Sequence, residues 1–256
     1  MQFQQTLKKN YSFEGKGLHT GKYAKMTVCP APENTGIVFV RTDISQDATV
    51  AALAENVSNT ARSTTISQNG ASVSTIEHIL SALTGMGVDN ALIEIDNVEV
   101  PILDGSAKPY IDAIWADGFV QQSEPRKYIE IKEAVEVVNE EVGSIVRIEP
   151  AEEFSYDIKV DFNSRVLGVQ HATWDPSTVY AEEIGVCRTF VFFHEIEFLF
   201  NNGLVKGGDV DNAIVIVEHP VTEQQISRMS ELFNIPALTV REDGYLSNLQ
   251  LRFPNE

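Results

Sequence analysis

The sequence predicts an α+β protein made of two similarly built parts, each with a β-sheet layered against helices. Segments typical of strands occur in both parts, and segments with a helical repeat of apolar residues follow them. A polar segment that contains a proline, residues 121–127, separates the two parts and is the best candidate for a linker. We therefore expect one domain over residues 1–122 and a second over residues 128–256.

The first part should begin with strands. The segment GKGLHTG at residues 15–21 carries three glycines, which permit tight backbone turns. Short apolar runs at residues 26–29 and 37–40 follow, separated by a turn-rich segment, and they predict two adjacent strands. Residues 91–95 predict a further strand.

Two helices are expected in the first part. One should start near Ser74, because apolar residues recur at helical spacing over residues 76–83 and two glycines then supply a stop. The other should carry the apolar residues of the segment 110–115 toward Gly118.

The second part should repeat this order of strands and helices. Apolar and polar residues alternate strictly over residues 154–162, as a half-buried antiparallel strand requires. Helices are expected over residues 189–199 and 222–233, the latter starting with a Thr222/Gln225 capping box. Residues 213–217 predict a strand between these helices.

Composition restricts the classes of partner. The 256 residues are 43% hydrophobic, which indicates a globular chain long enough for two domains. The net charge of −18 repels polyphosphates and argues against nucleic acid or an anionic membrane surface as the main partner. A small anionic ligand would need local donors, such as backbone amides at glycine turns.

The sequence also predicts a cytoplasmic protein. It has two distant cysteines, Cys29 and Cys187, which give no disulfide framework. No N-terminal signal peptide is recognisable, and no stretch approaches the roughly 20 apolar residues of a membrane span.

The pair Glu77-His78 is the strongest candidate for chemistry. A carboxylate beside an imidazole suits a metal hydrolase, because the imidazole can hold the metal while the carboxylate takes a proton from a water. The alternative is structural: Ser74 and Glu77 also fit a helix capping box, in which the carboxylate binds the cap amide and performs no chemistry.

Several longer segments stand out along the chain: GKGLHTG at 15–21, NTARSTTI at 59–66, STIEHILSALTGMGVDNALIEID at 74–96, EVPILDGSAKPY at 99–110, CRTFVFF at 187–193 and GGDVDNAIVIV at 207–217. Together they resemble the UDP-3-O-acyl-N-acetylglucosamine deacetylase family, the zinc amidases of lipid A biosynthesis in Gram-negative bacteria. The resemblance implies helices packed between two sheets.

The resemblance also implies roles for individual residues in hydrolysis of the N-acetyl group of UDP-3-O-(3-hydroxyacyl)-N-acetylglucosamine. Glu77 corresponds to the general base, His78 to a ligand of the Zn²⁺ cofactor, and Thr189 to the threonine that helps hold the oxyanion. Such a reaction needs a polarised carbonyl, a deprotonated water and a donor to the tetrahedral oxygen.

Further residues correspond to the family's substrate-binding positions. Gly207 and Gly208 match a pair that lets the backbone approach the nucleotide, and His19 matches a histidine bordering the active site. The passage for the acyl chain corresponds to Phe190, Ile196, Val205 and Ala213. Without the resemblance, apolar residues are more often core, a Gly-Gly pair is often a turn, and a loop histidine is often exposed.

Family members continue into an R-H-K-x-x-D-x-x-G-D helix with the remaining zinc ligands, and then into a G-H motif with the general acid. By this resemblance the second domain is expected to be incomplete. Residues 218–250 resemble the variety of the deacetylase that is fused to a β-hydroxyacyl carrier-protein dehydratase. A non-catalytic module that binds a nucleotide sugar or acyl chain, and a plain interaction domain, remain the alternatives to the enzyme.

Overall fold

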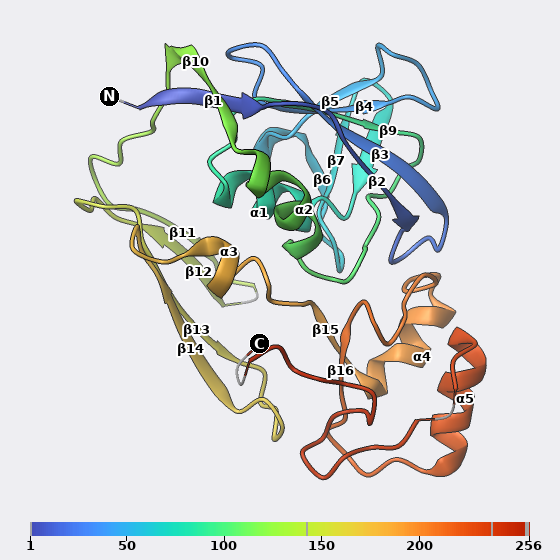
Figure 1. Cartoon of the computed structure of the whole chain (residues 1–256). Helices are drawn as coiled ribbons and strands as arrows, with labels where there is room; N and C mark the ends of the chain where they lie inside the picture. Colours follow the sequence, from blue (N-terminus) through green and yellow to red (C-terminus); the bar gives the residue numbers. More distant parts are fainter. Residues whose placement is uncertain (1, 142, 237, 254–255) are drawn as a thin grey trace.

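The computed structural model describes residues 2–141, 143–236, 238–253 and 256. It consists of two regions that differ in how completely their strands are buried. Figure 1 shows the first region, residues 2–126, above the second, residues 128–256. Both regions combine runs of strands with a few helices, so the predicted α+β class is confirmed. The division into domains stays a prediction.

A five-stranded sheet forms the main layer of the first region. Its order is β2 (Tyr11–Lys16), β3 (Tyr23–Pro30), β9 (Ala91–Ile95), β4 (Ile37–Arg41) and β5 (Thr49–Ala51). The prediction that β3 and β4 are adjacent is wrong, because β9 lies between them. It pairs antiparallel with β3 and parallel with β4.

Two smaller sheets complete the first region. The strands β6 (Val57–Asn59), β7 (Thr65–Gln68) and β8 (Ala71–Ser74) form one antiparallel sheet. The other pairs β1 (Phe3–Leu7) with β10 (Phe119–Pro125). The predicted linker is therefore largely wrong, because most of it is strand β10, most of whose polar side chains are exposed.

The core of the first region lies between the five-stranded sheet and two helices, α1 (Glu77–Gly85) and α2 (Lys108–Ile114). Figure 1 shows both helices on the side of the sheet that faces the second region. Ile79 and Leu83 of α1 and Ile93 of β9 are fully buried in this core. Each such side chain contributes about 1.5–3 kcal/mol to stability through burial.

Two β-hairpins begin the second region. They are formed by β11 (Val135–Asn139) with β12 (Ser144–Ile148) and by β13 (Tyr156–Asp161) with β14 (Val169–Trp174). The segment predicted as a half-buried strand does form β13. Its burial was predicted wrongly, because Tyr156 and Ile158 stay 51% and 49% exposed. The described elements contact the hairpin at its loop end, where Phe162 packs against Phe190, and leave Tyr156 and Ile158 largely exposed. Alternation here therefore marks a strand without marking a core.

The rest of the second region is a small layered unit. The parallel pair β15 (Phe190–Phe192) and β16 (Ile214–Ile216) packs with α4 (Phe193–Asn201) and α5 (Glu223–Phe233), and a short helix α3 (Tyr180–Glu183) precedes them. The helix predicted over 189–199 begins only at Phe193, because its first part is strand β15. The α5 helix starts with the predicted Thr222/Gln225 capping box.

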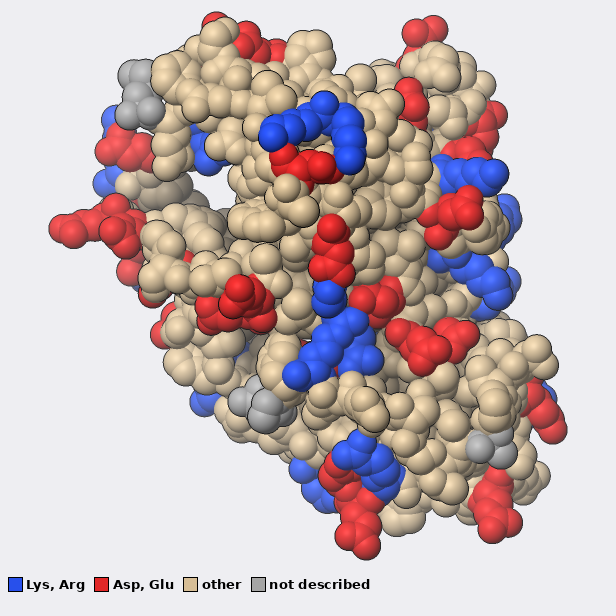
Figure 2. Space-filling view, viewed as in Figure 1, with Lys and Arg blue, Asp and Glu red and all other residues tan. Residues whose placement is uncertain are grey.

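The surface carries the excess of acidic residues. Figure 2 shows Asp and Glu spread over the visible face, whereas Lys and Arg gather in a few groups, one of them where the two regions meet. In the part of the chain that the structure describes, every helix is too short or too polar to cross a bilayer.

Candidate active site

The start of α1 is shaped by backbone geometry and not by a capping box. Ile76 is the N-cap residue and makes no side-chain cap bond, and Thr75 before it has a positive φ of 58°. The Ser74 amide donates to the carbonyl of Val98 at 2.9 Å, so it is not available to Glu77. The structural alternative for Ser74 and Glu77 is therefore wrong.

The Glu77 carboxylate has one occupied and one free oxygen. Its Oε1 accepts a hydrogen bond from the backbone amide of Thr64. Its Oε2 is buried and has no partner among the described residues. Because buried polar atoms are nearly always paired, a free buried carboxylate oxygen indicates a position meant for a ligand or for a reacting water.

His78 lies half-buried beside Glu77. Burial lowers the pKa of its imidazole, while the negative charges of Glu77 and Asp104 act in the opposite direction. The net direction favours the neutral ring at neutral pH, and the neutral ring is the form that binds metal ions.

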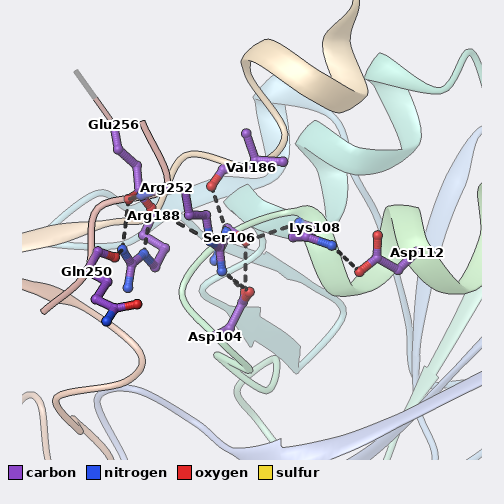
Figure 3. A network of polar contacts seen from close by, with 9 residues as sticks. All are labelled: Asp104, Ser106, Lys108, Asp112, Val186, Arg188, Gln250, Arg252 and Glu256. Carbon is purple, nitrogen blue, oxygen red and sulfur yellow. Dashed lines mark hydrogen bonds and ion pairs between the residues drawn. The ribbon is translucent and has the colours of Figure 1, made fainter. Parts of the chain in front are cut away.

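Asp104 connects this corner to the second region (Figure 3). Its carboxylate accepts from Arg252 at 2.6 Å and from the hydroxyl of Ser106 at 2.8 Å. Arg252 also donates to the Ser106 hydroxyl at 3.0 Å. Burial would raise the pKa of Asp104, but these hydrogen bonds outweigh burial and lower it. The Asp104-Gly105-Ser106 segment is a tight turn before α2, with a φ of 78° at Gly105.

A second ion pair lies beside this one and also involves the end of the described chain. Arg188 donates to both carboxylate oxygens of Glu256, at 2.5 and 2.7 Å, and the Glu256 side chain is fully buried. Figure 3 shows the Arg188 and Arg252 side chains next to each other between these carboxylates. The two ion pairs therefore fix residues 250–252 and 256 against the turn at Asp104.

Glu99 is a functional candidate that sequence reasoning missed. It is 1% exposed, and its carboxylate accepts four hydrogen bonds, from the amides of His19 and Thr20 and the hydroxyls of Thr20 and Thr75, all between 2.7 and 2.9 Å. It thus ties the His19 loop to the residues just before Glu77. A single glutamate between two apolar valines was the signal available in the sequence.

The loop at His19 is also held by the second region. The amides of Lys206 and Gly207 donate to the carbonyls of His19 and Leu18, at 3.2 and 3.0 Å. A Cβ on Gly207 would overlap the carbonyl oxygen of Gly17. Glycine is therefore required at 207 so that two backbones can meet. We call this contact the backbone junction.

An apolar cavity of about 100 Å³ lies next to the junction, and we call it the passage. Apart from Glu77, His78 and Gly207, every predicted site residue contributes to its lining. These residues are His19, Thr189, Phe190, Ile196, Val205, Gly208 and Ala213. Arg62 also lines the passage and pairs with Glu195 of α4 at 2.6 Å.

The turn at Gly105 joins the passage to the Glu77-His78 pair. The Thr189 amide donates to the carbonyl of Gly105 at 2.8 Å, and the neighbouring Asp104 acts electrostatically on His78. The turn thus bonds to Thr189, which lines the passage, and its Asp104 influences His78.

The described residues do not fit a complete zinc site. Within them, no group of three His, Cys, Asp or Glu side chains is placed to hold a metal ion. A catalytic zinc normally takes three protein ligands, and His78 with Glu77 supplies one imidazole and one carboxylate.

A free buried carboxylate beside a half-buried imidazole, in an α+β fold with a narrow apolar cavity, has the features of a hydrolase. Comparison with known proteins makes this class specific. The model of the LpxC family, "UDP-3-O-acyl N-acetylglycosamine deacetylase", matches residues 4–234. The chain belongs to this family.

Individual relatives agree with this assignment. The chain is 43% identical over 256 residues to the bifunctional enzyme LpxC/FabZ of Porphyromonas gingivalis, a match that covers 100% of this chain and 55% of the relative. It is 42% identical over 231 residues to the UDP-3-O-acyl-N-acetylglucosamine deacetylase of Helicobacter hepaticus, covering 90% of this chain and 76% of the relative. The chain thus spans about half the length of the bifunctional relatives.

Proposed function

We propose that the protein hydrolyses the N-acetyl group of UDP-3-O-(3-hydroxyacyl)-N-acetylglucosamine and that this chain supplies its base and its acyl-chain passage. The observation that carries the proposal is the free, buried Oε2 of Glu77 next to His78. Family membership indicates the substrate class, since the matching relatives are named for this deacetylation.

Each residue of the site has a proposed role. Glu77 accepts the proton of the attacking water through Oε2, while the Thr64 amide holds Oε1 and fixes the orientation of the carboxylate. The Thr189 hydroxyl donates to the oxygen that becomes negative in the tetrahedral intermediate. Gly207 and Gly208 border the part of the substrate that carries the nucleotide, and His19 borders the active site.

Zn²⁺ is the proposed cofactor, with His78 as one of its ligands. Zinc would polarise the acetamide carbonyl when bound. Because the described residues hold no three-ligand group, we propose that the other ligands come from further parts of a longer protein, as the greater length of the relatives suggests. For the same reason we propose a FabZ-type dehydratase as a further part of that protein.

The test is deacetylation by the full-length protein. Glu77→Gln keeps the size of the side chain but removes the base, so acetate release should fall by roughly 100-fold or more. Glu55→Gln, at an exposed site in the same region, should leave the rate unchanged. His78→Ala should lower the zinc content measured by metal analysis. Unchanged turnover in Glu77→Gln would refute the role of Glu77.

One observation favours a second candidate, a binding module without catalysis: the described residues form the passage but no three-ligand group. A zinc-loaded protein that binds the UDP-sugar but releases no acetate would support this second candidate.

A further inference from the structure

A second cavity shares two lining residues with the passage. It is a groove of about 640 Å³ between α4, the segment 217–221 and α5, and we call it the α4–α5 groove. Ile196 of α4 and Met229 of α5 line both cavities. These two side chains therefore form the wall between them.

The two residues that form this wall differ in side-chain flexibility. Ile196 and Met229 are 5% and 4% exposed and belong to one core cluster. Ile196 is β-branched and stiff, whereas Met229 is unbranched, with three rotatable bonds, and can fill or leave a gap with little strain. Met229 is therefore the more movable of the two residues that line both the passage and the groove.

The passage alone is too small to hold a long acyl chain, so such a chain needs additional space. Ligand pockets typically measure roughly 300–1,000 Å³, so about 100 Å³ is small even for part of a lipid-like substrate. The passage and the groove together fall within the usual range.

The groove has a surface that suits the end of an alkyl chain. Phe193, Val217, Val221 and Leu232 contribute apolar lining, and charged side chains form the rim. Across the rim, Arg228 of α5 lies 3.7 Å from Glu197 of α4. Such an exposed pair holds the two helices together only weakly, so α5 can adjust to an occupant.

We propose that Met229 is a gate between the passage and the α4–α5 groove, and that α5 thereby sets the length of acyl chain the protein accepts. Short acyl chains end against Met229, whereas longer chains displace its side chain and place their ends in the groove. The proposal rests on the proposed function, because it assigns the far end of the same substrate.

Methionine NMR tests the gate directly. The chain has four methionines, and Met26 and Met86 are buried in the core of the first region, where they serve as internal references. The full-length protein, labelled at the methionine methyl groups, is titrated with UDP-N-acetylglucosamine carrying either 3-hydroxyhexanoyl or 3-hydroxytetradecanoyl. The Met229 signal should shift with the longer ligand only, while Met26 and Met86 stay unchanged.

The outcomes separate the inference from the function on which it rests. If both ligands bind and the Met229 signal responds equally to both, or to neither, the gate is refuted and the proposed function stands. If calorimetry shows that neither ligand binds the zinc-loaded protein, the proposed function fails and the gate fails with it.

Substitutions at Met229 give a second, independent test. Met229→Ala should raise the affinity for the tetradecanoyl ligand relative to the hexanoyl ligand by roughly tenfold, and Met229→Trp should lower this ratio by a similar factor. Leu246→Ala is the matched control, because Leu246 is buried in the same cluster but lines neither cavity. It should lower stability without changing the ratio, and an equal change in the ratio would refute the gate.

Discussion

Strands rich in apolar residues occur in both regions, but they are buried in the five-stranded sheet of the first region and exposed in the hairpins of the second. In the first region, one face of β9 is buried in the core and Ile93 on that face is fully buried. In the second, β13 alternates apolar and polar residues more strictly than β9 does, yet Ile158 is 49% exposed and Val146 on β12 is 67% exposed. Alternation therefore predicts that a segment is a strand, whereas burial depends on what packs against it.

A matched pair of truncations should show the contrast most strongly. Ile93→Ala should lower the free energy of unfolding by about 2–5 kcal/mol, because it opens a cavity in a closed core. Ile158→Ala should change it by about 0.5 kcal/mol or less, because solvent fills the space. Urea unfolding measures both, and equal losses would show that β13 is covered in solution.

Glu99 should be the most sensitive polar residue of the first region. Glu99→Ala leaves buried donors on His19, Thr20 and Thr75 unpaired, which should destabilise the protein by on the order of 3 kcal/mol. Glu99→Gln keeps an acceptor and should lose less. Thermal unfolding compares these variants with exposed Glu55→Gln, and a loss no larger than that of the control would contradict this role.

The backbone junction tests whether the two regions depend on each other. Gly207→Ala forces the Lys206–Gly208 segment away from Gly17 and should cost about 1–3 kcal/mol. Hydrogen exchange should then speed up at the Lys206 and Gly207 amides. Gly15→Ala is the control, since its Cβ would meet only ordinary contacts, at 3.5 Å or more. Unchanged exchange in Gly207→Ala would show that the junction is not formed in solution.

Acid should weaken the contact between the regions at Asp104. The pKa of Asp104 is lower in the folded protein than its ordinary value of about 3.9, so its stabilising contribution is present above that value and is lost as the pH falls through the folded pKa. Asp104→Asn should cost about 1 kcal/mol at neutral pH, given partial exposure of the pair. The difference in free energy of unfolding between Asp104→Asn and the unsubstituted protein, measured by urea unfolding, should vanish below about pH 4. A difference that does not change with pH would exclude the Asp104 carboxylate as its source.

Local signals in the sequence predicted individual elements well. The Thr222/Gln225 box, the extent of β9 and the helical period of α1 all depend on neighbouring residues, and the structure has them as predicted. Pairing was harder to predict, because β9 enters between β3 and β4 from a distant part of the chain. The helix expected from Thr189 is shortened because residues 190–192 pair with β16.

The residues of the candidate site also differ in whether the sequence could reveal them. Family resemblance selected the residues that the structure brings to the passage. It did not select Glu99, whose importance comes from four donors that only the folded chain assembles. The roles of the site residues themselves remain predictions for the experiments above.

The backbone junction has one more consequence. Because carbonyl and amide groups make it, and every amino acid except proline carries both, most mutations at Leu18, His19 or Lys206 would leave its bonds in place. The loop that borders the passage can thus change its side chains over evolutionary time, and with them its ligand preference, without losing its anchorage. The glycine at 207 lacks this freedom, because a Cβ there would overlap the carbonyl oxygen of Gly17.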